Sequence, residues 1–133
     1  MKQIQNRLKE WGKNVMKKVI NNPDQVVEEM LEGVVLAHPQ YVKRVKGFSV
    51  LTRANSPSPK VALVSGGGSG HEPSHGGFVG RGMLDGAVAG AVFTSPTPDQ
   101  ILEAVKAVDG GKGVLLVINL GSRKKLYLHK FFS

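Results

Sequence analysis

Residues 61–73 read VALVSGGGSGHEP, an apolar run followed by a glycine-rich segment. The continuous apolar run 61–64 is typical of a buried strand in a sheet that is covered on both faces. The glycines after it let the backbone turn sharply and bring its N–H groups close to a ligand. Because open α/β sheets bind ligands at the carboxyl ends of their strands, we expect a ligand-binding loop over 65–73. The simpler alternative is a tight strand-to-helix connection without a ligand.

Helices and further strands are predicted on both sides of this segment. A first helix is expected to begin after Asn22, a capping residue followed by Pro23, and to end at His38-Pro39. A second helix is expected from Thr97 to Val108, since its apolar residues share one face. Strands that alternate with helices predict an α/β fold, a layered α/β/α domain with a central sheet. The remaining strand candidates are 48–53, 87–93 and the apolar run 114–118, which we expect to be buried.

Composition narrows the possible functions. There is no cysteine, which disfavours a secreted disulfide protein and favours a cytoplasmic one. No apolar run approaches the roughly 20 residues of a membrane helix, so no membrane association is expected. The net charge of +8 divides into +3 for residues 1–15, +4 for residues 121–133 and only +1 for the body between them. A nearly neutral body does not predict a nucleic-acid-binding face.

Two familiar kinds of site can be compared with the glycine segment. The sequence contains no Gly-Lys-Ser/Thr and no G-x-G-x-x-G, so it shows no nucleotide site of its own. His71-Glu72-Pro73-Ser74-His75 formally matches the H-E-x-x-H zinc signature, which needs both histidines on one continuous helix. Pro73 and the following Gly76-Gly77 oppose such a helix, so a zinc hydrolase is only a remote alternative and no metal is expected. His71 is the stronger chemical candidate, because imidazole relays protons near neutral pH.

The ordered motifs resemble the substrate-binding subunit of dihydroxyacetone kinase. The resemblance covers about residues 16–118 and rests on motifs before, within and after the glycine segment. These are Leu51-Thr52-Arg53-Ala54, Ser65 to Pro73, Gly80-Arg81-Gly82-Met83-Leu84, Phe93-Thr94-Ser95-Pro96-Thr97-Pro98-Asp99 and Asp109-Gly110-Gly111-Lys112-Gly113-Val114-Leu115.

This resemblance implies that the domain presents dihydroxyacetone for phosphorylation. It assigns substrate contacts to Gly68, Ser69, Gly70, His71 and Ser95, and the catalytic proton transfer to His71. It also implies a homodimer, and a phosphate donor (ATP/ADP) held by a separate nucleotide-binding subunit or domain rather than by this chain. A non-catalytic triose-binding or regulatory partner is the alternative function.

The ends of the chain depart from the family pattern. Residues 1–15 are interpreted as an N-terminal extension before a domain over 16–120, and residues 121–133 as an atypical basic tail, possibly out of frame. Asn119 stands where the family has a lysine, and a later histidine that bonds the substrate carbonyl is absent. The resemblance therefore implies a truncated chain whose central sheet is incomplete and which is inactive alone.

Overall fold

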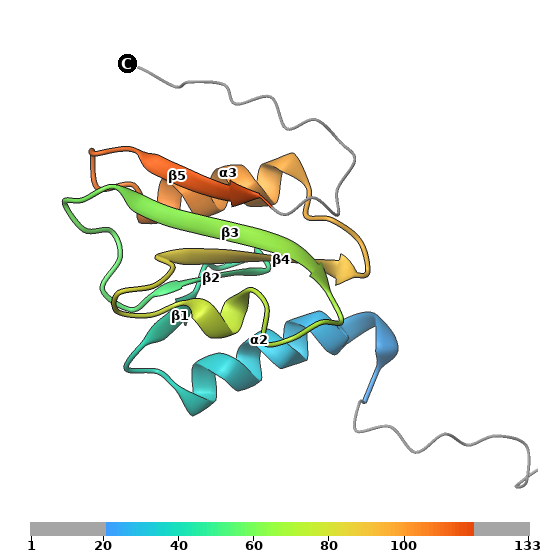
Figure 1. Ribbon diagram of the computed structural model, residues 1–133. Helices are drawn as coiled ribbons and strands as arrows, with labels where there is room; N and C mark the ends of the chain where they lie inside the picture. Colours follow the sequence, from blue (N-terminus) through green and yellow to red (C-terminus); the bar gives the residue numbers. More distant parts are fainter. Residues whose placement is uncertain (1–20, 119–133) are drawn as a thin grey trace, which may run out of the picture.

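The structure is a computed structural model that describes residues 21–118. Figure 1 shows a central sheet with one helix on each side. The elements in chain order are the 3-10 helix η1 (Pro23–Gln25), α2 (Val26–Ala37), β1 (Val42–Arg44), β2 (Val50–Arg53), β3 (Ala62–Ser69), the 3-10 helix η2 (Gly76–Phe78), β4 (Gly86–Val92), α3 (Pro98–Val108) and β5 (Val114–Ile118).

The five strands form one mixed sheet in the order β1-β2-β4-β3-β5. Strand β3 lies between β4 and β5 and runs parallel to both, whereas β2 pairs antiparallel with β1 and β4. The carboxyl ends of β3 and β4 therefore lie side by side at one edge of the sheet, on the right of Figure 1. This is the edge at which open α/β sheets place their ligands.

Two apolar cores cover the two faces of the sheet. On one face, Ala104 and Val108 of α3 pack with Val50, Val64 and Val88. On the other face, Leu31 of α2 packs with Val42, Leu51 and Ala87. Neighbouring residues of one strand, such as Val50 and Leu51, thus enter different cores, as the alternation of side chains in a strand requires. The predicted α/β/α layering is confirmed.

Both helices begin where the sequence predicts. The Asn22 side chain accepts a hydrogen bond from the amide of Asp24 at 3.0 Å, and η1 then leads directly into α2. Thr97 forms a capping box with Gln100 at the start of α3. Each cap satisfies backbone donors that have no partner inside the helix.

Three features of the sheet differ from the prediction. The short strand β1 carries no strong pattern and was not expected. Strand β3 continues to Ser69, so the predicted loop 65–73 begins only at Gly70. Strand β5 is not buried: it is an edge strand of the described sheet, and Leu115, Val117 and Ile118 are about half exposed. An apolar run alone does not distinguish a central strand from an edge strand.

Several predictions fall on residues outside the described range. These are the N-terminal extension, the start of the domain at residue 16, Asn119 and the basic tail 121–133. Within residues 21–118, no helix is long and apolar enough to cross a membrane.

Candidate functional site

Two segments that are distant in sequence meet at the carboxyl ends of β3 and β4. The segment after β4 folds back over β3, and its backbone lies against Gly68 and Gly90. A Cβ added at Gly68 would lie 2.7 Å from the Thr94 amide nitrogen, and one at Gly90 would lie 2.0 Å from the Thr94 carbonyl oxygen. The backbones approach so closely that no larger residue fits without a shift. The sequence prediction assigned Gly68 to ligand approach, whereas the structure gives it a packing role as well. No role was predicted for Gly90.

Ser69 ties the same strands together. Its side chain is buried and donates a hydrogen bond of 2.8 Å to the Gly90 carbonyl oxygen. The Ser69 carbonyl oxygen in turn accepts a hydrogen bond of 2.8 Å from the Phe93 amide. Ser69 therefore also holds β3 to β4, and Ser95 lies exposed on the crossing segment.

Phe93 has an unusual backbone conformation for a bulky residue. Its φ is 51°, in the left-handed region that costs non-glycine residues energy. Its side chain is 80% exposed, and the ring lies 3.0 Å from the position that a Cβ on Gly70 would occupy. Strained residues cluster at functional sites, so this outlier supports a site at the edge of the sheet. Sequence reasoning included Phe93 only as part of a motif.

His71 lies in a turn that starts directly after β3. The Glu72 carboxylate accepts the Gly70 amide at 3.0 Å, which closes the turn and leaves the His71 side chain exposed. Glu72 therefore caps the turn itself and not a following helix. An exposed imidazole at the carboxyl end of a strand is available to a small ligand.

The zinc alternative is not supported by this geometry. Residues 71–75 form successive turns rather than a continuous helix, so His71 and His75 do not stand one helical turn apart. Among residues 21–118, no group of three or more His, Cys, Asp or Glu side chains could hold a metal ion. Helical geometry is what the H-E-x-x-H signature needs, and Pro73 and the glycines prevent it.

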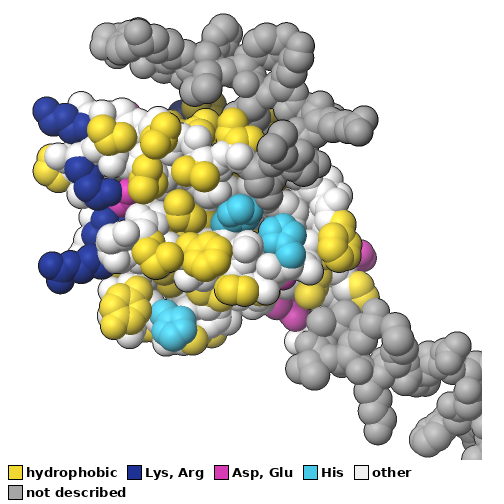
Figure 2. Space-filling view, in the orientation of Figure 1, with side chains coloured by type: hydrophobic (Ala, Val, Ile, Leu, Met, Phe, Trp, Pro, Cys, Tyr) yellow, Lys and Arg dark blue, Asp and Glu magenta, His cyan; other side chains and the backbone are white. Residues whose placement is uncertain are grey.

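His75 lies beside His71 but in a different environment. The rings are 5.7 Å apart between centroids and nearly perpendicular, at 85°. Figure 2 shows two histidine side chains side by side on this face, away from the lysine and arginine side chains gathered along the left edge. His75 Nδ1 lies 3.0 Å from the hydroxyl oxygen of Ser65, which is buried. Burial, together with the nearby charge of His71, lowers the pKa of His75.

A cavity of about 240 Å³ lies between the sheet and α2, below the turn. It is open to Gly68, Ser69, Glu72 and His75, whereas Gly70, His71 and Ser95 do not line it. Most of its other walls are apolar and include Met30, Leu31, Val34, Leu51, Ala87 and Val88, while Ser74 adds a further polar side chain. The predicted contact residues are thus divided between the cavity and the exposed edge of the sheet.

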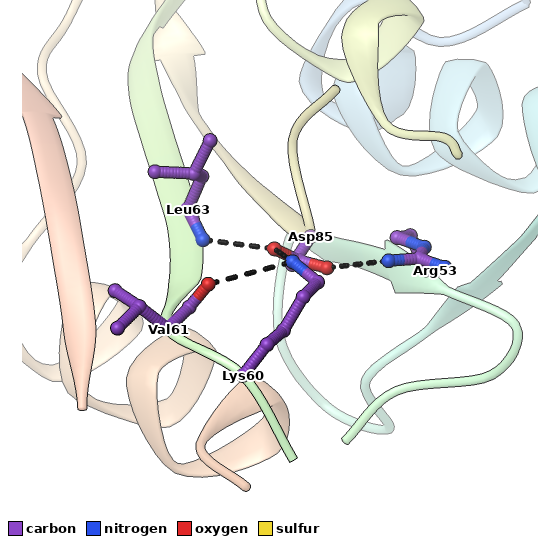
Figure 3. Close-up of polar contacts among 5 residues, drawn as sticks. All are labelled: Arg53, Lys60, Val61, Leu63 and Asp85. Atoms are coloured by element: carbon purple, nitrogen blue, oxygen red, sulfur yellow. Dashed lines mark hydrogen bonds and ion pairs between the residues drawn. The ribbon is translucent and has the colours of Figure 1, made fainter. Parts of the chain in front are cut away.

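A buried charge cluster lies at the opposite edge of the sheet, where β3 and β4 begin (Figure 3). Asp85 is 1% exposed and accepts hydrogen bonds from Arg53 at 2.8 Å, Lys60 at 2.5 Å and the Leu63 amide at 2.9 Å. Burial alone would raise the pKa of Asp85, but these donors together hold it below its usual value. The cluster is far along the strands from His71, and we interpret it as structural.

The family model described as the Dak1 domain matches residues 32–120. The chain is 61% identical over 103 residues to the dihydroxyacetone-binding subunit of PTS-dependent dihydroxyacetone kinase 1 from Listeria innocua, a match that covers 77% of this chain and 31% of that subunit. It is 55% identical over 104 residues to the corresponding subunit of the PEP-dependent enzyme of Escherichia coli, covering 77% and 29%.

Solved structures that are similar to this chain also come from dihydroxyacetone kinases. The crystal structure of dihydroxyacetone kinase from C. freundii in complex with AMP-PNP and Mg²⁺ superposes with a TM-score of 0.69 at 39% identity. That match covers 75% of this chain and 19% of the kinase, so the chain spans less than a third of the length of the relatives it matches. Sequence and structure together place this chain in the Dak1 domain family.

Proposed function

We propose that this chain binds dihydroxyacetone at the carboxyl ends of β3 and β4, as the substrate-binding part of a dihydroxyacetone kinase. One observation carries the proposal: the glycine strand and the Phe93–Ser95 segment meet beside an exposed histidine, in a chain that is 61% identical to a dihydroxyacetone-binding subunit. Because the chain spans 31% of that subunit, both the substrate and the phosphoryl transfer belong to the proposal.

The site has the groups that a small polyol requires. His71 directly follows Gly70, and Ser95 follows the Phe93–Thr94 backbone that lies against Gly68. Both residues are exposed, and together they can orient a hydroxyl group. In this proposal the imidazole of His71 accepts the hydroxyl proton while that oxygen attacks the incoming phosphoryl group. The bond from that phosphorus to the phosphate donor then breaks, and the donor keeps the electron pair.

The proposal places the phosphate donor elsewhere. The sequence contains no phosphate-binding loop of the Walker type, so we assign the nucleotide, ATP or ADP, to a separate kinase subunit or domain. A homodimer of the complete domain and a cytoplasmic location complete the proposal.

A regulatory role is the second candidate. A solved structure described as a dihydroxyacetone kinase operon co-activator matches this chain with a TM-score of 0.63 at 44% identity, covering 67% of this chain and 27% of the co-activator. The same domain is thus also present in a protein named as a co-activator. In this alternative the chain binds the triose without transferring phosphate.

Titration of the isotope-labelled chain with dihydroxyacetone tests the proposal by NMR. We expect saturable shifts of the backbone signals of Gly68 to His71 and of Ser95, and weaker shifts with glycerol, which lacks the carbonyl group. A folded chain whose signals do not respond to dihydroxyacetone would contradict binding. Saturable binding with product formed in the presence of the nucleotide-binding subunit and its phosphate donor supports the kinase role. Saturable binding without product supports the regulatory one.

A further inference from the structure

Ser65 links the edge strand β5 to the turn that carries His71. Its hydroxyl group donates a hydrogen bond of 2.8 Å to the Val117 carbonyl oxygen and lies 3.0 Å from His75 Nδ1. A hydroxyl group has one proton, and a carbonyl oxygen can only accept. Since that proton is used on Val117, the contact with His75 requires Nδ1 to be the donor. His75 is then the tautomer with its proton on Nδ1 and a lone pair on Nε2.

The surroundings of His75 favour its neutral form. Within residues 21–118, its Nε2 atom is buried and has no hydrogen-bond partner. The cavity walls from α2, β2, β3 and β4 contribute no ionisable side chain, and the turn adds Glu72 to these walls. His71 lies outside the cavity, with its ring against that of His75. The Glu72 carboxylate is already bound to the Gly70 amide. A proton on Nε2 would therefore be buried without a hydrogen-bonding acceptor, next to a second imidazole.

The two rings also fix each other's position. Their perpendicular arrangement at 5.7 Å is the edge-to-face geometry that aromatic rings prefer. His71 itself is exposed, so its side chain depends on such contacts for a defined orientation. A defined orientation is what a proton acceptor needs in order to act on a bound hydroxyl group.

We infer that His75 is a positioning residue for His71: Ser65 holds His75 as the neutral tautomer protonated on Nδ1, and the His75 ring braces the His71 imidazole. The role of His71 in this inference rests on the proposed function. The tautomer of His75 does not, because it follows from the contacts of Ser65 in the free chain.

The tautomer can be measured directly on the full chain without any ligand. Long-range ¹H–¹⁵N NMR distinguishes protonated from unprotonated imidazole nitrogens. We expect one protonated nitrogen in His75, Nδ1, and one unprotonated nitrogen, Nε2, at neutral pH. A His75 that is protonated on Nε2, or that averages between both forms, would overturn the inference without any variant being needed.

Substitution of Ser65 tests the link to His71. In S65A we expect His75 to lose its single tautomer and the His71 ring signals to shift, and S65T, which keeps the hydroxyl group, to restore both. S49A is the matched control, because it removes a serine hydroxyl bound to Glu28 elsewhere in the fold. If S65A changes the tautomer of His75 but leaves the His71 signals as in the wild type, His75 does not position His71. Absence of dihydroxyacetone binding, with the expected tautomer present, would count against the proposed function alone.

Discussion

The Phe93 amide donates a hydrogen bond of 2.8 Å to the Ser69 carbonyl oxygen, and this contact joins the two motif segments of the candidate site. Beside it, the Thr94 backbone occupies the space that a side chain on Gly68 would need. The two segments are separated by more than twenty residues. They pack so closely that the position of Gly68 has no room for a side chain beside the Thr94 backbone. The glycine segment thus serves the packing of the site before any ligand is considered.

The first prediction is that Gly68→Ala destabilises the chain. The new methyl group would lie 2.7 Å from the Thr94 amide nitrogen, so the crossing segment must shift. We expect the free energy of unfolding to fall by about 1–3 kcal/mol, as for other overpacked sites. Urea unfolding followed by circular dichroism measures it. Gly80→Ala is the control, because no atom lies within 4 Å of its added Cβ. Equal losses in both variants would refute the packing argument.

The second prediction concerns the Asp85 cluster. Asp85→Asn leaves Arg53 and Lys60 without the buried carboxylate that both of them contact. We expect a loss of about 3 kcal/mol in the free energy of unfolding, the low end for breaking a buried ion pair, because Lys60 is 46% exposed and can turn toward water. Asp109→Asn is the matched control, since it removes the same charge from an exposed residue. A loss no larger than that of the control would show that the cluster contributes little.

The pH dependence of the cluster follows from the same carboxylate. The folded pKa of Asp85 is held below its unfolded value of about 3.9, so its contribution is complete above that pH and is lost as the pH falls through the folded value. Wild-type chain should therefore lose more stability than Asp85→Asn between pH 5 and pH 3. If the free energy of unfolding of the two proteins falls equally between pH 5 and pH 3, Asp85 does not cause the loss of stability.

The sequence was sufficient for the parts of the fold that have local signals. Asn22 and Thr97 predict the starts of their helices, because capping depends on only a few neighbouring residues. The alternation of strands and helices likewise predicts the layers. The end of β3 could not be placed, since glycines 66–68 indicate a loop by composition and become strand only through pairing with β4 and β5.

The sequence could predict which residues belong to the candidate site, but not which of them contact one another. The motif gave His71 and Ser95, but the contact between Ser65 and His75 depends on where β5 lies beside β3. The same limit applies to Asp85. Its partners are Arg53 at the end of β2, Lys60 before β3 and the Leu63 amide at the start of β3. No spacing in the sequence predicts that these residues meet. Contacts between distant segments are decided by tertiary structure, which local patterns do not contain.

The third prediction is that His75 makes the chain less stable in mild acid. Burial, with the charge of His71, lowers its folded pKa below the unfolded value of about 6.5. The unfolded chain therefore binds the proton first, and the free energy of unfolding falls as the pH drops through 6.5 and on to the folded pKa. Urea unfolding at several pH values should show this slope, reduced in His75→Gln. His38→Gln, which replaces an exposed histidine outside the site, should keep the wild-type slope. If His75→Gln also keeps the wild-type slope, a group other than His75 causes the pH dependence of the free energy of unfolding.

The last prediction is that His71→Asn weakens the response to dihydroxyacetone more than it weakens the fold. His71 is exposed, and the turn around it is closed by Glu72 and the Gly70 amide, so its side chain contributes to packing mainly through the edge-to-face contact with His75. We expect the free energy of unfolding to change by at most about 0.5 kcal/mol, as for surface substitutions. Loss of one hydrogen bond to the ligand should raise the dissociation constant roughly tenfold, which corresponds to about 1.4 kcal/mol. NMR titration of both proteins measures this, with His38→Asn as a control of equal chemistry outside the site. Unchanged binding in a folded His71→Asn chain would remove His71 from the site and leave the cavity beside His75 as the place to look for the ligand.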